Sequence, residues 1–169
     1  YADAYHFENL NERQRLQVQR SADHDKSEWL SDQLASILSE WKYPLHFIDF
    51  ETSMVAVPFY KGFHPYEQIA FQFSSHTVHQ HGKIEHSEWI CAEPGVFPNF
   101  EFVKALKQEL ENDDGTIFRY APHENTVLKQ IQKQMEDHKD DEFGELIEWI
   151  DTIDRKSTRL NSSHGLISY

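Results

Sequence analysis

The chain has 169 residues, of which 38% are hydrophobic and 14% aromatic. This is enough apolar material for one ordinary domain with a buried core, and it excludes wholesale disorder. The sequence contains no run of about 18 apolar residues, so we expect no membrane span. The single cysteine, Cys91, excludes an internal disulfide and a cysteine-rich zinc site, and a reducing, cytoplasmic setting is therefore expected.

Acidic side chains outnumber basic ones by 29 to 16, which gives a formal net charge of −13. A protein that coats nucleic acid should be basic, so this class is disfavoured. An enzyme that binds a phosphate backbone through metal ions is not disfavoured, because its acidic residues hold the cations and the cations attract the phosphates.

The predicted elements begin with a polar segment, residues 1–26, which we expect to be a linker or a peripheral structure. The domain is expected to span 27–153 and to begin with an amphipathic helix over 27–41, which Pro44 ends. Apolar alternation then predicts three strands: 45–51, 68–79 and 83–91. The turn at Gly82 joins the last two strands so closely that they should pair antiparallel.

A helix, a strand and two further helices complete the predicted domain. They are expected over 100–112, 116–121, 123–138 and 142–153. Pro122 suits the first turn of the helix that follows it. This order predicts an α/β domain whose mixed sheet has three antiparallel strands followed by a helix–strand–helix unit.

Residues 154–169 differ in composition from everything before them. The string DRKSTRLNSSH (154–164) has no apolar period and matches, residue for residue, the in-frame translation of a common short-read sequencing adapter. Ile167, Ser168 and Tyr169 match the continuation of the same adapter. We therefore expect a non-native tail, outside the fold, and a domain that is C-terminally truncated.

Two carboxylates mark the end of the first predicted strand. Asp49 and Glu51 lie two residues apart, so alternation should place both on the same face. Side by side on apolar surface they repel each other, and a divalent cation relieves that repulsion. Mg²⁺ is usually held by one or two carboxylates together with phosphate and water. The alternative is that Glu51 is simply solvated and Asp49 caps a turn.

Glu124 and His123 begin the helix that follows the fourth predicted strand. The N-terminus of a helix favours a negative charge, which suits Glu124 with or without a function. His123 is placed to orient a ligand or a water molecule, although histidine at a helix start is also common. Neither residue by itself separates these alternatives.

Two further groups of side chains are candidates. Histidines at alternating strand positions suit Zn²⁺, but without a Cys or HExxH pattern they are better explained as exposed edge residues. They are His76, His79, His81 and His86. An aromatic run after the acidic strand either stacks on bases or forms a satellite core. It contains Phe59, Tyr60, Phe63 and Tyr66.

In this order the features resemble the RNase H-like 3′–5′ exonucleases of the DnaQ (DEDD) superfamily, whose first motif is similar to FIDFET (47–52). The stretch from about 42 to 153 more closely resembles the bacterial family called domain of unknown function 2779. Three blocks carry that resemblance: YPLHFIDFET (43–52), PFYKGFHPYEQIAFQFSSH (58–76) and GTIFRYAPHENTVL (115–128).

The resemblance implies an RNase H-like mixed sheet and a 3′–5′ exonuclease that hydrolyses DNA or RNA with two Mg²⁺ or Mn²⁺ ions. It makes Asp49 and Glu51 metal ligands of the first motif, and it places Glu124, with His123 beside it, at the second. Glu124 stands there in place of Asp, and the Asn that usually precedes it is absent.

The superfamily's third motif, a late Asp with a His or Tyr general base, has no counterpart before residue 153. We attribute this to truncation and expect the fragment to be inactive. Full-length relatives imply an upstream RecB-type nuclease region. Two hypotheses from other classes stay open: an inactive RNase H-like module that binds nucleic acid or a protein, favoured by the acidic charge and the missing motif, and a histidine-based zinc hydrolase.

Overall fold

The computed structural model describes residues 7–22, 29–30, 32, 34–119, 122–138, 141–159 and 167–168. The chain forms two compact units, one of Tyr1–Glu40 with Ser162–Tyr169 and the other of Trp41–Asn161.

The first unit contains short elements. In chain order they are η2 (Phe7–Asn9), α1 (Glu12–Ala22), β1 (Trp29–Leu30), α2 (Leu34–Glu40) and β7 (Ile167–Ser168). A reciprocal pair of hydrogen bonds begins α1: the backbone N of Gln14 donates to Asn11 Oδ1, and the backbone N of Asn11 donates to Gln14 Oε1, both at 2.9 Å. Strands β1 and β7 pair antiparallel.

The helix predicted over 27–41 is wrong in its first half. Trp29 and Leu30 form β1, and the helix covers only Leu34–Glu40, with no buried residue. The reason is tertiary: β1 pairs with a segment far along the chain, which helical periodicity does not reveal. The predicted start at Ser27, together with Glu28, Ser31 and Gln33, lies outside the described residues.

The second unit is built on a mixed sheet of five strands in the order β4-β3-β2-β5-β6. Its strands are β2 (Leu45–Met54), β3 (Gln68–Val78), β4 (Ile84–Ile90), β5 (Thr116–Arg119) and β6 (Ser157–Arg159). The first three pair antiparallel, and β5 runs parallel to both β2 and β6. The predicted mixed α/β sheet with three antiparallel strands is thus confirmed.

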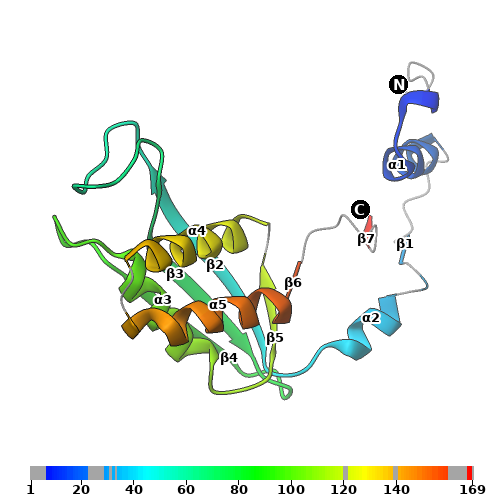
Figure 1. Ribbon diagram of the computed structural model, residues 1–169. Coiled ribbons are helices and arrows are strands. Elements are labelled where there is room, and N and C mark those ends of the chain that lie inside the picture. Colours follow the sequence, from blue (N-terminus) through cyan, green and yellow to red (C-terminus); the bar gives the residue numbers. More distant parts are fainter. Residues whose placement is uncertain are drawn as a thin grey trace. The chain divides into compact units, whose positions relative to one another are not determined.

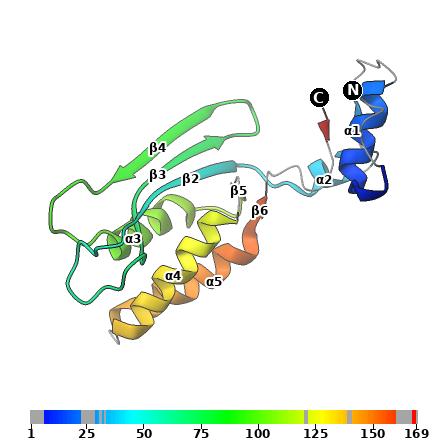
Figure 2. The same ribbon diagram turned by 90° about the horizontal axis from the view of Figure 1, so that it is seen from above.

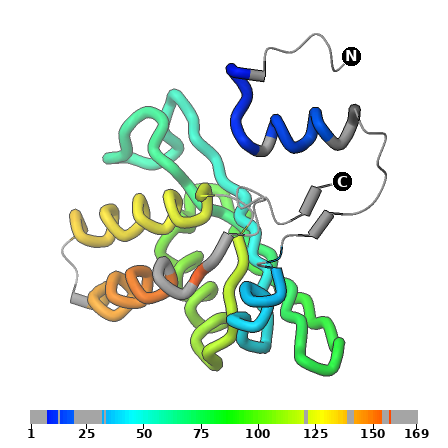
Figure 3. The backbone as a smooth tube through the Cα atoms, turned by 90° about the vertical axis from the view of Figure 1, so that its right-hand side faces the viewer, coloured from blue at the N-terminus to red at the C-terminus, as the bar shows by residue number. Residues whose placement is uncertain are grey.

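Three helices pack on one face of this sheet (Figure 2). They are α3 (Asn99–Leu110), α4 (His123–His138) and α5 (Gly144–Lys156), the last preceded by η3 (Asp141–Phe143). Helices α4 and α5 run side by side (Figures 1 and 3). The apolar stripes predicted for α3 and α4 are buried as expected, with Phe102, Val103, Leu106 and Leu110 on α3 and Val127, Leu128, Ile131 and Met135 on α4.

The end of the domain differs from expectation. The last helix, predicted to stop at Ile153, continues to Lys156, and Ser157–Arg159 adds strand β6 beside β5. The non-native origin of 154–169 stays a prediction from the sequence, and residues 160–166 and 169 lie outside the described residues.

A buried histidine on β2 forms hydrogen bonds with β3 and with the segment that precedes β5. His46 is 3% exposed; its Nδ1 lies 3.0 Å from Thr77 Oγ1 and its Nε2 3.0 Å from Asp113 Oδ1. A carboxylate only accepts, so Nε2 carries the proton, and in the neutral ring Nδ1 accepts from the threonine hydroxyl. The backbone N of Gly115 donates to the same Asp113 oxygen at 2.8 Å. A Cβ on Gly115 would lie 2.1 Å from the carbonyl oxygen of Pro44, so only glycine fits there.

We therefore predict that Gly115→Ala lowers the free energy of unfolding by about 3 kcal/mol, because the backbone of Pro44 and the His46–Asp113 pair must both move. Gly144→Ala is the matched control, since its Cβ would meet nothing within 4 Å. At the start of α5 this control should change stability by less than about 1 kcal/mol, in the stabilising direction. Urea unfolding of both variants checks this, and equal effects would contradict it.

Candidate functional site

The two carboxylates predicted at the first strand lie together on an exposed face of β2. Their neighbours Ile48 and Phe50 are each 5% exposed and belong to the core beneath the helices. Alternation therefore directs Asp49 and Glu51, both exposed, to the opposite side of the sheet, which we call the outer face. Asp49 Oδ1 also accepts a hydrogen bond from the backbone N of Phe50 at 3.1 Å.

An irregularity in the sheet follows these carboxylates directly. Glu51 pairs with Gln72, but the next residue, Thr52, pairs with Ala70, so Phe71 is an extra residue on β3. A β-bulge of this kind bends the strand, increases its twist and re-aims the side chains around it. The bend is therefore in β3, while β2 continues to pair with it beyond Glu51, through Thr52, Ser53 and Met54.

The same end of β2 meets the start of α4. The parallel ladder between β2 and β5 ends at the pair Ile48 and Arg119, and α4 begins at His123. Parallel neighbours present their carboxyl ends at the same edge of a sheet. Thr52 Oγ1 accordingly lies 3.3 Å from His123 Nε2, a contact between residues 71 positions apart in the chain.

Glu124, at this edge, has a buried carboxylate whose hydrogen bonding is incomplete. Its side chain is 2% exposed, and its Oε2 is buried with no hydrogen-bond partner among the described residues. Burying an unpaired polar oxygen costs free energy, and a buried charge costs more. The position in the first turn of α4 offsets part of that cost. A hydrogen-bond donor or a cation at Oε2 would offset the rest.

The structure brings some of the predicted site residues together and separates others. Asp49 and Glu51 share the outer face, and His123 contacts the end of their strand. Glu124 instead belongs to α4, the helix that packs against the opposite face. Over the described part of the chain, no three His, Cys, Asp or Glu side chains are grouped so as to hold a metal ion.

The four histidines of the hairpin do not gather at one point. His76 and His86 face each other across β3 and β4 with ring centroids 4.5 Å apart. His79 instead bonds through Nε2 to Glu85 at 2.7 Å. Hydrogen bonds from Lys83, first, and then from His79 hold the pKa of Glu85 below its usual value. The fourth, His81, is exposed in the turn.

Two residues of the aromatic run form the satellite core that was one of its two predicted roles. Tyr60 and Phe63 pack against Phe97, and the Tyr60 hydroxyl donates to the carbonyl of Val96 at 2.6 Å. Burial, and secondly the charge on Cys91, raise the pKa of Tyr60. These two aromatic residues form a satellite core.

The other two aromatic residues of the run stay in solvent. Phe59 is 68% exposed and Tyr66 is 63% exposed. Tyr66 also has a φ of 63°, a left-handed backbone that a bulky residue seldom adopts.

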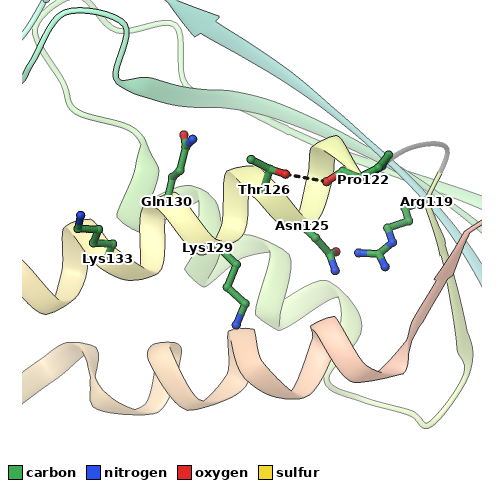
Figure 4. A pocket seen from close by; sticks show the side chains of 7 residues that line it. All are labelled: Arg119, Pro122, Asn125, Thr126, Lys129, Gln130 and Lys133. Carbon is green, nitrogen blue, oxygen red and sulfur yellow. Dashed lines mark hydrogen bonds between the residues drawn. The ribbon is translucent and has the colours of Figure 1, made fainter.

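One feature escaped the sequence analysis: a groove of about 480 Å³ along α4 (Figure 4). Its lining residues are Arg119, Pro122, Asn125, Thr126, Lys129, Gln130 and Lys133. The only sequence signal is the i, i+4, i+8 spacing of Asn125, Lys129 and Lys133, which also describes an ordinary solvated helix face. Arg119 joins them only because β5 ends beside the start of α4.

The fold and site define an α/β protein whose mixed sheet presents two carboxylates beside a helix start. The chain belongs to the family described as Domain of unknown function (DUF2779), which matches residues 46–160. The match begins in β2 and continues past Ile153 through β6. No curated protein and no solved structure matches the chain. Among the residues described, no helix is both long and apolar enough to cross a membrane.

The unpartnered oxygen of Glu124 leads to a prediction about stability. In metal-free buffer, Glu124→Gln should leave the melting temperature unchanged or raise it, because the substitution removes a buried charge while keeping the shape of the side chain. The measurement is thermal unfolding followed by circular dichroism.

Glu67→Gln is the matched control, since the Glu67 carboxylate accepts hydrogen bonds from Gln134 Nε2 at 2.9 Å and from the backbone N of His64 at 2.8 Å. It should lower the free energy of unfolding by about 1 kcal/mol. If Glu124→Gln were the more damaging of the two, the Glu124 carboxylate would be stabilised by the protein alone.

Proposed function

We propose that this chain forms part of a metal-dependent nuclease of the RNase H-like type, a 3′–5′ exonuclease that hydrolyses phosphodiester bonds in DNA or RNA. The observation that carries the proposal is the buried, unpartnered Oε2 of Glu124 at the edge where the strand of Asp49 and Glu51 ends. Three antiparallel strands followed by a parallel one, with a helix between them, support the RNase H-like assignment.

The donor set suits Mg²⁺ or Mn²⁺, since both prefer carboxylate oxygens and both keep several waters. Asp49, Glu51 and Glu124 would hold the ions. When bound, two such ions activate a water molecule and stabilise the leaving oxygen of the phosphodiester.

The chain itself would position the metal ions and orient a water molecule. The exposed pair Asp49 and Glu51 would receive ions from solvent on the outer face. The bulge at Phe71 on β3 lies directly opposite the step from Glu51 to Thr52, and increases the local twist of the sheet beside the carboxylates. His123, held 3.3 Å from Thr52, would orient a water at the helix start.

A second candidate function is an RNase H-like module that binds nucleic acid without cleaving it. It is favoured by the division of the carboxylates between the outer face and α4, and by the basic groove along α4. The two candidates differ in one property: only the nuclease needs ions at Asp49 and Glu51.

We expect Mn²⁺ and Mg²⁺ to raise the melting temperature of the chain. At ten times the dissociation constant, ligand binding contributes about 1.4 kcal/mol, which corresponds to a rise of about 3–6 °C for a domain of this size. Asp49→Asn and Glu51→Gln should each abolish most of that rise, and Glu124→Gln should reduce it. Differential scanning calorimetry with and without the metal makes the measurement.

Glu136→Gln is the control, because this carboxylate is exposed near the far end of α4. It should keep the full metal-induced rise. A wild-type chain without any rise, or a rise that Asp49→Asn retains, would overturn the metal assignment and leave the binding module as the better hypothesis.

A further inference from the structure

The groove along α4 is a basic surface on an acidic chain. Three of its seven lining residues are basic and none is acidic, whereas the whole chain carries 29 acidic and 16 basic side chains. Such a local reversal of charge attracts anions to one place while the rest of the surface repels them.

The polar and cationic side chains of the groove are arranged in a line. This stripe consists of Asn125, Lys129 and Lys133, which follow one another at four-residue intervals, and it extends about 12 Å along α4. Arg119 adds a fourth position at the end of β5, and the side chains of Asn125 and Arg119 point toward each other (Figure 4). A linear series of polar and cationic groups suits a linear polyanion better than a single small anion.

The charges along this line are not equally available. Lys129 is paired with Asp151 at 2.5 Å and also donates to Gln132. Lys133 is exposed and has no ion-pair partner among the residues described. Within the described part of the chain, Lys133 is therefore the lysine of the groove that an incoming phosphate reaches without displacing an ion-pair partner.

The groove begins at the end of the sheet where α4 starts. Arg119 pairs with Ile48 in the β2–β5 ladder, so its side chain lies on the helix-covered face of the sheet, opposite to that of Asp49. A chain held along the stripe from Lys133 to Arg119 is therefore directed toward the end of the sheet where His123 and Glu124 begin α4.

A second pocket, of about 320 Å³, continues the groove on the other side of the same residues. It shares Gln130 and Lys133 and is also lined by the exposed ring of Tyr66. This pocket also has two acidic residues, Glu67 and Asp137, which lie beyond the Lys133 end of the stripe. Of these, Glu67 is already hydrogen-bonded within the protein. An exposed aromatic ring beside a cationic groove is the arrangement on which unpaired bases stack.

We propose that this groove binds single-stranded nucleic acid. Lys133 and Arg119, at the two ends of the stripe, contact separate phosphates of one strand, and Tyr66 stacks on a base. A duplex would keep its bases paired and unavailable to Tyr66, so the arrangement favours a single strand. The inference rests on the proposed function for the nature of the ligand, but its residues are different from the proposed metal ligands.

Binding of a fluorescein-labelled 12-nucleotide oligo(dT), measured by fluorescence anisotropy in EDTA, tests the proposal on the full chain. Lys133→Glu should weaken binding about tenfold. It should also make the negative slope of log affinity against log salt shallower by about 0.7 or more. Lys83→Glu makes the same change of net charge at the β3–β4 turn, outside the groove, and should weaken binding less than about twofold.

The aromatic contact has its own matched pair. Tyr66→Leu should weaken binding about fivefold or more, because stacking is lost while the side chain keeps much of its bulk. Phe59→Leu alters another exposed aromatic residue that does not line either pocket, and it should leave the affinity unchanged. Circular dichroism of all four variants establishes that they fold.

Several results would overturn the proposal. They are the absence of oligo(dT) binding by the wild type, equal weakening by Lys133→Glu and Lys83→Glu, and competition by poly-glutamate as strong as by unlabelled oligo(dT). The last would assign the groove to an acidic protein. Because EDTA removes metal, Asp49→Asn should bind oligo(dT) normally. If oligo(dT) does not bind but Mn²⁺ still raises the melting temperature, the groove proposal fails and the proposed metal site stands. If oligo(dT) binds but Mn²⁺ has no effect, the proposed metal site fails and the groove proposal stands.

Discussion

The parallel pairing of β2 with β5 is the contact on which the rest of the second unit depends. It joins residues about 70 positions apart and thereby determines where α4 begins. Its first rung is held by a reciprocal pair of hydrogen bonds: the backbone N of Thr116 donates to the carbonyl of Lys42, and the backbone N of Lys42 donates to Thr116 Oγ1, both at 2.8 Å. The close approach of Gly115 to Pro44 lies directly beside this rung.

The two faces of the sheet have different surroundings, and this difference shapes the candidate site. Three helices cover the face that contains Ile48, Phe50 and Phe73, and their apolar stripes exclude water from it. The outer face carries Asp49 and Glu51 in solvent, with an aromatic cluster of Trp41, Phe47 and Phe118 toward the other end of the strands. Carboxylates on one face and Glu124 on a helix against the other can act together only at the edge where β2 ends.

The electrostatics of the unit are similarly divided. Acidic residues dominate the composition, yet the outward side of α4 carries cations along a continuous groove. Salt screens charges on exposed surfaces beyond about 8–10 Å, so what an anionic partner experiences is the local arrangement rather than the formal net charge. The negative net charge therefore disfavours nucleic-acid binding over the surface as a whole but not in this groove.

Local pattern in the sequence was sufficient for β2, β3, β4 and β5, for α3 and α4, and for the shared face of Asp49 and Glu51, because alternation and helical periodicity depend only on neighbouring residues. It failed for Trp29 and Leu30, which pair with a distant strand, and for the end of α5. The sequence by itself determined the central elements of the second unit, from β2 to α4, and the candidate carboxylates. Only the tertiary structure decided that His123 meets Thr52, that Oε2 of Glu124 is buried without a partner, and that Arg119 extends the lysine stripe of α4. Each of these depends on the pairing of β2 with β5, a long-range contact that no local period encodes.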